Sequence, residues 1–253
     1  MARGRQTTGP PDFIGVGTQR SGTTWWFGTL LQHPDIRPPR ERRKELHFFN
    51  RFAWQEMRDA DIARYHQRFP RRPGQLTGEW TPRYMHNFWT PRLIRRAAPE
   101  AKLLVMFRDP IERFRSGVPK ERSVDAGRPV DAIVADAIER GRYASQLERL
   151  RAGHETAQIL ILQYENCVAD PVGEFQRTLR FLGADPDHEP RDVERTRGRS
   201  QAPSKKPLWP DLVDALTASM EPEVRRLAAI APEIDVSLWP NFSHLARANA
   251  PAA

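Results

Sequence analysis

Residues 13–24 read Phe13-Ile14-Gly15-Val16-Gly17-Thr18-Gln19-Arg20-Ser21-Gly22-Thr23-Thr24. The first five of them are apolar or glycine and predict a short buried strand over 13–17. A turn that contains glycine follows, and the apolar spacing over 23–32 predicts a helix. A strand, a glycine-bearing turn and a helix, in this order, open a βαβ unit, so we expect an α/β fold.

The alternation of strands and helices continues along the chain. Two more strands are predicted, at 102–107 and 158–163, and each runs into a polar turn. Helices are predicted from about Pro110, over 130–150, and from Pro171 to Leu182, before Gly183. Strands that alternate with helices pair in parallel and are covered on both faces. We therefore expect a single three-layer domain with a central parallel sheet flanked by helices.

The domain is predicted to span 12–245, between a flexible N-terminal tail, 1–11, and a C-terminal tail, 246–253. Residues 191–207 are polar and basic and lack apolar periodicity, so we expect a loop or lid there. Its cations either close over a ligand or form a solvated basic loop. They are Arg197, Arg199, Lys205 and Lys206.

The composition excludes several classes of protein. With 253 residues, 39% hydrophobic and 28% charged, the chain is neither disordered nor a membrane protein. The apolar run Leu103–Phe107 is far shorter than the about 20 residues that span a bilayer, and no signal-peptide segment follows Met1. Cys167 is the single cysteine, which excludes an intramolecular disulfide. We expect a cytoplasmic location without stable membrane insertion.

The net charge of +8 admits two kinds of partner. A nucleic acid would need a long basic tract or basic residues interleaved with aromatic ones, and the sequence has neither. A small polyanionic ligand explains the positive charge equally well. We expect the ligand and no nucleic-acid partner.

Residues 17–24 have the spacing of a phosphate-binding P-loop: two glycines separated by four residues, then a hydroxyl pair. Thr23 stands where the usual lysine would be, which disfavours ATP cleavage, but Arg20 leaves a cation inside the loop. Backbone N–H groups and the start of the helix favour an anion. The alternative is a turn that only starts a helix. The residues expected to contact the anion are Thr18, Gln19, Arg20, Ser21, Gly22, Thr23 and Thr24.

A second polar turn, Arg108-Asp109-Pro110, follows the strand at 102–107. Because the carboxyl ends of parallel strands meet at one edge of the sheet, this turn should lie beside the first loop. Arg108 offers a bidentate guanidinium to a phosphate, and Ser116 can return to it from the following helix. Taken alone, such a turn is usually a helix start with an exposed arginine.

The two loops together resemble those of sulfotransferases that use 3′-phosphoadenosine 5′-phosphosulfate (PAPS), and the closest motifs are of the heparan-sulfate type. In that family the first loop binds the 5′-phosphosulfate and an Arg…Ser pair binds the 3′-phosphate, which implies Arg108 and Ser116 here. Further similar segments follow in the family's order. They are Glu45 with His47-Phe48-Phe49-Asn50, Gly78-Glu79-Trp80-Thr81-Pro82-Arg83-Tyr84, Gly141-Arg142-Tyr143, Tyr164-Glu165-Asn166, Asp170-Pro171, Phe181-Leu182-Gly183, and Leu238-Trp239-Pro240 with Phe242.

The resemblance implies transfer of a sulfuryl group from PAPS to a hydroxyl or amine of a glycan, glycolipid or small metabolite. PAP is released, and no metal is required. Glu45 matches the family's base, although a solvated carboxylate in 41–45 is the alternative. One alternative is that His47 is the base. We favour the other alternative, in which His47 is a packed or orienting residue. Arg20 stands where many relatives have lysine and is expected to stabilise the leaving group.

One departure concerns the acceptor side of the expected site. Relatives of the heparan-sulfate type, which are Golgi enzymes, carry a lysine where this chain has Trp80. Either Arg83 or a residue of 191–207 supplies the missing charge, or the site manages without it. Trp80 itself either stacks on an acceptor ring or packs in the core. Competing functions are a small-molecule kinase, a PAPS-binding protein without turnover, and an RNA-binding module.

Overall fold

The computed structural model describes residues 5–191, 193 and 207–247. Its centre is a five-stranded sheet with the order β3-β5-β2-β6-β7, in which every pair of neighbours is parallel. The strands are β3 (Ile36–Arg37), β5 (Leu76–Trp80), β2 (Phe13–Gly17), β6 (Lys102–Phe107) and β7 (Ile159–Gln163). The parallel sheet expected from the sequence is confirmed.

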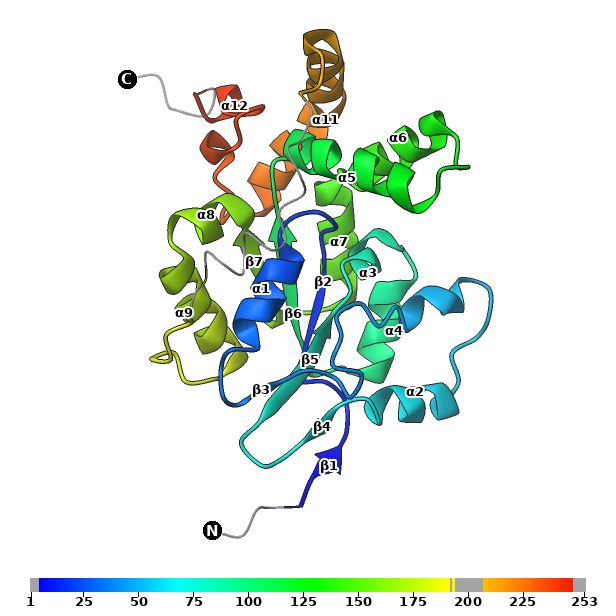
Figure 1. Cartoon of the computed structure of the whole chain (residues 1–253), viewed down its shortest axis with the longest axis vertical. Coiled ribbons are helices and arrows are strands. Elements are labelled where there is room, and N and C mark those ends of the chain that lie inside the picture. Colours follow the sequence, from blue (N-terminus) through cyan, green and yellow to red (C-terminus); the bar gives the residue numbers. More distant parts are fainter. Residues whose placement is uncertain (1–4, 192, 194–206, 248–253) are drawn as a thin grey trace.

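Helices cover both faces of this sheet (Figure 1). Successive residues of β6 enter different hydrophobic clusters: Leu103 and Val105 pack in one, and Leu104 and Met106 in the other. The smaller cluster joins the sheet to α1 (Thr23–Leu30) and α9 (Pro171–Leu182). The larger joins it to α4 (Thr90–Ala97), α7 (Tyr143–Gly153) and α11 (Pro210–Ile230). The three-layer α/β fold is therefore confirmed.

The remaining elements connect or flank this core. They are β1 (Thr7–Thr8), η1 (Phe49–Ala53), α2 (Asp59–His66), β4 (Pro70–Arg71), α3 (Arg83–His86), α5 (Pro110–Val124), α6 (Val130–Glu139), η2 (Thr156–Gln158), α8 (Tyr164–Ala169), η3 (Val236–Leu238) and α12 (His244–Arg247). Within the segment expected as an N-terminal tail, β1 pairs antiparallel with β4. The expected lid residues Arg197, Arg199, Lys205 and Lys206 lie outside the described residues.

The helical periodicity predicted over 130–150 belongs to two helices. Two helices, α6 and α7, occupy this segment, and a turn at 140–142 separates them. A hydrogen bond from the Gly141 amide to the carbonyl of Ile138 (2.8 Å) closes the turn. Beyond it, the ring of Tyr143 packs 4.7 Å from that of Phe107. The apolar periodicity continues through the break because Tyr143 and Leu147 still face the core.

Candidate active site

The loop between β2 and α1 is tied to the end of β6. The amide and the hydroxyl of Thr18 both donate to the carbonyl of Met106, at 3.0 and 2.9 Å. The hydroxyls of Thr18 and Ser21 lie 2.6 Å apart. Gly22 has φ of +90°, and a Cβ there would lie 2.6 Å from the ring of Tyr164. The loop thus needs glycine at this position for its backbone conformation and for the close approach of that ring.

Arg20 contacts both Ser116 and Arg108, two residues predicted to bind a phosphate. The Arg20 guanidinium donates from Nε to the Ser116 carbonyl (3.1 Å) and from Nη2 to the Ser116 hydroxyl (3.0 Å). Arg108 donates from Nη1 to the carbonyl of Arg20 at 3.4 Å. Burial, and then the charge of Arg108, lower the pKa of Arg20. Two guanidinium groups therefore lie close together beside the loop, where a bound anion would relieve their repulsion.

The surroundings of Arg108 fit a phosphate ligand. Its guanidinium carbon lies 4.4 Å from the centre of the Tyr164 ring, and Nη2 lies 3.5 Å from a carboxylate oxygen of Glu112. Its buried Nε has no hydrogen-bond partner among the residues that the structure describes. A buried donor without a partner is costly, and an added acceptor would satisfy it. The donor set therefore fits the phosphate groups of a PAPS-like ligand.

The other predicted loop residues surround the same point. The Oε1 atom of Gln19 is buried and has no partner within the described part of the chain. Thr23 and Thr24 form the first turn of α1, with Thr23 buried and Thr24 exposed. All seven predicted loop residues thus lie at the carboxyl edge of β2, next to the turn that contains Arg108.

Glu45 lies beside the end of β5, and its amide donates to the carbonyl of Trp80 at 3.1 Å. Lys44 donates to one carboxylate oxygen of Glu45 at 2.6 Å, and Nε2 of His47 lies 3.4 Å from the other. These two partners, His47 first, lower the pKa of Glu45 to about 2 against the opposing effect of burial. Glu45 in turn raises the pKa of Arg20. The candidate base and the candidate cation therefore lie near each other.

His47 is not a packed core residue, because its side chain is 46% exposed. Its Nδ1 lies 3.0 Å from the amide nitrogen of Asn50. An amide nitrogen can only donate, so Nδ1 accepts and the proton of the neutral ring is on Nε2, facing Glu45. This geometry fits the orienting role, since both ring nitrogens of neutral His47 are then occupied.

A buried hydrogen-bond frame, which was not predicted from the sequence, lies under this segment. The carboxylate of Glu79, fully buried in β5, accepts from the hydroxyls of Tyr65 (2.7 Å), Thr81 (2.6 Å) and Tyr84 (3.1 Å). It also accepts from the amide of Leu46, although burial dominates and raises the pKa of Glu79. All of these partners are donors, which suits an ionised carboxylate.

The frame holds the backbone around the candidate base. The hydroxyl of Thr81 accepts from the His47 amide (3.4 Å), and that of Tyr84 accepts from the Phe48 amide (2.9 Å). Glu45 and His47 have positive φ values of 66° and 50°. Non-glycine residues adopt this conformation at a cost that the surrounding contacts must offset. In the sequence, the only signal of this frame was a glutamate followed by a threonine two residues later and a tyrosine five residues later.

Trp80 packs in the core, which is one of the two alternatives expected for it. Its side chain is fully buried, and its indole N–H donates to the carbonyl of Gly17 at 3.1 Å. Arg83, one of the residues considered for the missing charge, is exposed, and its charge lowers the pKa of His86. Lys44, which the sequence analysis did not consider, is the lysine that lies beside Glu45.

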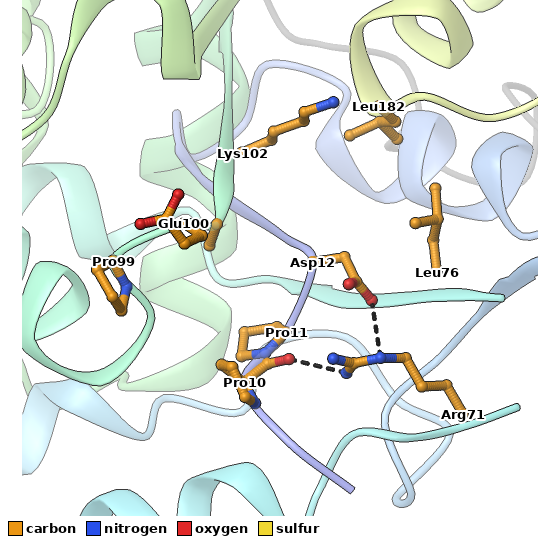
Figure 2. Close-up of a pocket in the computed structure, with 10 residues that line it drawn as sticks. Pro10, Pro11, Asp12, Arg71, Leu76, Pro99, Glu100, Lys102 and Leu182 are labelled. Carbon is orange, nitrogen blue, oxygen red and sulfur yellow. Dashed lines mark hydrogen bonds and ion pairs between the residues drawn. The ribbon is translucent and has the colours of Figure 1, made fainter. Parts of the chain in front are cut away.

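A separate cavity lies at the opposite edge of the sheet, where β2 and β6 begin (Figure 2). It has a volume of 360 Å³ and is lined by residues that include Asp12, Arg71 and Lys102. Asp12 and Arg71 lie 3.6 Å apart, and Arg71 also donates to the carbonyl of Pro10 at 2.8 Å. These contacts join the first strands to the domain, and the cavity shares no residue with the loop.

Within the described ranges, no group of three or more His, Cys, Asp or Glu side chains is placed to hold a metal ion. Over the same part of the chain, no helix is long and apolar enough to cross a bilayer.

Curated relatives are similar over about two thirds of the chain. The mouse protein "Heparan sulfate glucosamine 3-O-sulfotransferase 6" is 31% identical over 186 residues, 68% of this chain and 52% of the relative. The human "Heparan sulfate glucosamine 3-O-sulfotransferase 3B1" is 30% identical over 187 residues, 68% of this chain and 46% of the relative. The chain thus spans about half the length of these relatives.

The cytoplasmic location expected from the sequence is wrong by this comparison. The similar curated proteins are of the heparan-sulfate type, whose members are Golgi enzymes. Similarity to them therefore argues against a cytoplasmic location.

Solved structures and a family model agree on the fold. A sulfotransferase from Alicyclobacillus acidocaldarius superposes with a TM-score of 0.71 at 25% identity, over 90% of this chain and 98% of that one. A mouse sulfotransferase complexed with PAP shares the fold at 14% identity, with a TM-score of 0.52, over 78% of this chain and 70% of that one. The family model described as "Sulfotransferase domain" matches residues 10–226. This match covers most of the chain, which therefore belongs to the sulfotransferase family.

Proposed function

We propose that the chain transfers the sulfuryl group of PAPS to an acceptor hydroxyl or amine and releases PAP. The observation that carries this proposal is the convergence of Arg20, Ser116 and Arg108 at the loop after β2. Cations from two separate strand ends meet there, as a ligand with phosphates at both its 3′ and 5′ positions would require. Membership of the sulfotransferase family supports the same donor.

The donor-binding roles follow from the two loops. Residues 18–24 would hold the 5′-phosphosulfate through backbone N–H groups at the start of α1. Arg108 and Ser116 would hold the 3′-phosphate, and the Nε of Arg108, which has no partner among the described residues, supports this role. When bound, PAPS supplies the sulfuryl group and the phosphate on which the leaving charge develops.

Glu45 would take the acceptor proton while the acceptor oxygen or nitrogen bonds to sulfur. The bond from sulfur to the 5′-phosphate oxygen breaks at the same time, and its electron pair stays on that oxygen. Arg20 would stabilise this charge as a cation that does not give up a proton. His47 would orient Glu45 through the contact at 3.4 Å. No metal is needed in this scheme.

With a pKa of about 2, Glu45 is ionised but weakly basic in the ligand-free protein. A phosphosulfate bound near Arg20 would bring negative charge close to Glu45. Like charges raise the pKa of a carboxylate, so donor binding would make Glu45 a stronger base. An order of binding in which the donor precedes the acceptor fits this electrostatic coupling.

Among the acceptors considered, we favour a sugar hydroxyl. The curated relatives are named as 3-O-sulfotransferases of heparan sulfate glucosamine, an acceptor that is a sugar hydroxyl. Glycolipids and small metabolites with a hydroxyl or amine remain the other acceptor classes.

The test is an acceptor screen with isotopically labelled PAPS, read by mass spectrometry for an added sulfuryl group. Reactions contain EDTA in one arm and Mg²⁺ in the other, and Glu45→Gln serves as the control with impaired chemistry. We expect equal turnover in both arms and formation of PAP. Transfer of phosphate from ATP that depends on Mg²⁺ would instead identify a kinase.

A further inference from the structure

Lys44 pairs with the candidate base and is close enough to the candidate leaving-group cation, Arg20, to feel its charge. Its ammonium donates to Glu45 at 2.6 Å, and its side chain is 12% exposed, against 39% for Glu45. Burial lowers the pKa of Lys44, the Glu45 carboxylate raises it, and the charge of Arg20 lowers it further. Lys44 is therefore within electrostatic range of both groups that the proposed reaction uses.

The ammonium of Lys44 has donors to spare. An ammonium carries three N–H groups. Glu45 is the one hydrogen-bond partner of Lys44 among the residues that the structure describes. A largely buried ammonium with a single partner is poorly solvated, so a second anionic group nearby would be a favourable contact.

Among the described side chains, no second lysine lies beside Glu45. Trp80 is fully buried and uncharged. Of the chain's lysines, the structure describes the side chains of Lys44 and Lys102, and Lys102 lines the cavity at the opposite edge of the sheet (Figure 2). Within the described side chains, Lys44 is thus the lysine that lies beside Glu45 and within electrostatic range of Arg20.

We propose that Lys44 is a further catalytic residue, whose ammonium contacts the sulfuryl oxygens of the bound donor. This proposal rests on the proposed function. A lysine on a flexible stem can turn from Glu45 to a second anion without moving the backbone. Its departure removes a positive charge from Glu45, so the same movement would hold the sulfuryl group and strengthen the base.

The test compares binding of PAPS and PAP by titration calorimetry in the absence of acceptor. PAP lacks the sulfuryl group, so a contact with that group affects PAPS alone. We expect Lys44→Met to raise the ratio of the PAPS to the PAP dissociation constant about tenfold, as loss of a charged hydrogen bond would. Lys44→Arg keeps the charge and should retain much of the wild-type ratio. Lys102→Met, the matched control at the other edge, should leave it unchanged.

The outcomes separate this proposal from the proposed function. If the wild-type protein fails to bind PAP, the proposed function is wrong. If PAP binds and Arg108→Ala weakens it, but folded Lys44→Met keeps the wild-type ratio, Lys44 only pairs with Glu45 and the proposal is overturned. Should Lys44→Met not fold, an amine-acylating reagent is applied to the wild-type protein. PAPS must then protect Lys44 better than PAP does, and equal protection would refute the proposal.

Discussion

The hydroxyl of Tyr84 joins the buried carboxylate of Glu79 to the backbone beside the candidate base. It donates to Glu79 at 3.1 Å and accepts from the Phe48 amide at 2.9 Å. Tyr65 donates to the same carboxylate oxygen at 2.7 Å, but within the described part of the chain its hydroxyl does not bond to the backbone beside the candidate base. The two tyrosines thus share one buried partner and differ in their contact with the segment.

This difference predicts separable effects of Tyr84→Phe and Tyr65→Phe. Each variant removes a buried hydrogen bond and should lower the free energy of unfolding by about 1 kcal/mol. Only Tyr84→Phe also frees the Phe48 amide, so kcat should fall about tenfold as the base loses its position. Urea unfolding and steady-state kinetics with saturating donor measure the two effects. Equal loss of kcat in both variants would mean that the contact of Tyr84 with the Phe48 amide does not position the base.

The donor site predicts a preference for PAP over AMP in thermal shift. A ligand that binds only the native state raises Tm by mass action, and AMP lacks the 3′-phosphate. Arg108→Ala and Ser116→Ala should remove most of the difference, and Arg83→Ala, a change at an exposed arginine, should not. Ser116→Ala should also loosen Arg20, because the Ser116 hydroxyl accepts a hydrogen bond from the Arg20 guanidinium. Equal stabilisation of the wild-type protein by PAP and AMP would contradict the assignment.

The loop glycine can be tested against a matched position. Gly22 and Gly74 both have positive φ, +90° and +81°, but a Cβ at Gly74 would meet nothing within 4 Å. Gly74→Ala should therefore cost about 1 kcal/mol, the backbone conformation alone. Gly22→Ala adds a clash with Tyr164, so it should be more destabilising and should also weaken PAP binding. Indistinguishable unfolding curves for the two variants would show that Tyr164 moves aside freely.

Much of the fold follows from local patterns. Continuous apolar runs mark the strands at 13–17 and 102–107. A glycine in the left-handed region, Gly183, marks the end of α9. By contrast, β5 was not predicted, because Glu79 stands where a buried strand should be apolar. Hydroxyls from Tyr65, Thr81 and Tyr84 make that burial tolerable, and a local hydrophobic pattern does not predict such side-chain hydrogen bonds.

The candidate site also contains residues that the sequence pattern predicts and residues that it does not. The loop and the Arg108 turn were predictable because parallel strands bring their carboxyl ends to one edge. Lys44 could not be found in this way, because it lies in a charged run that resembles a solvated surface. Only its burial and its contact with Glu45 distinguish it from its neighbours.

The pH dependence of kcat/KM for an identified acceptor distinguishes the roles of Glu45, His47 and Arg20. A carboxylate base is active when ionised, so activity falls on the acidic side of its pKa. His47 is the largest cause of the lowered pKa of Glu45. His47→Ala should raise that pKa and move the acidic limb to higher pH, with a smaller loss of rate than Glu45→Gln causes.

Glu45→Gln keeps the shape of the side chain but removes the base, so the limb should vanish and kcat should fall about 10²-fold or more, typical for general-base loss. PAP affinity should barely change. Arg20→Ala should weaken donor binding and also slow turnover, because the same cation meets the phosphosulfate before and during transfer. If Glu45→Gln keeps near-full activity while His47→Ala is inactive, the base is His47, and the orienting role passes to Glu45.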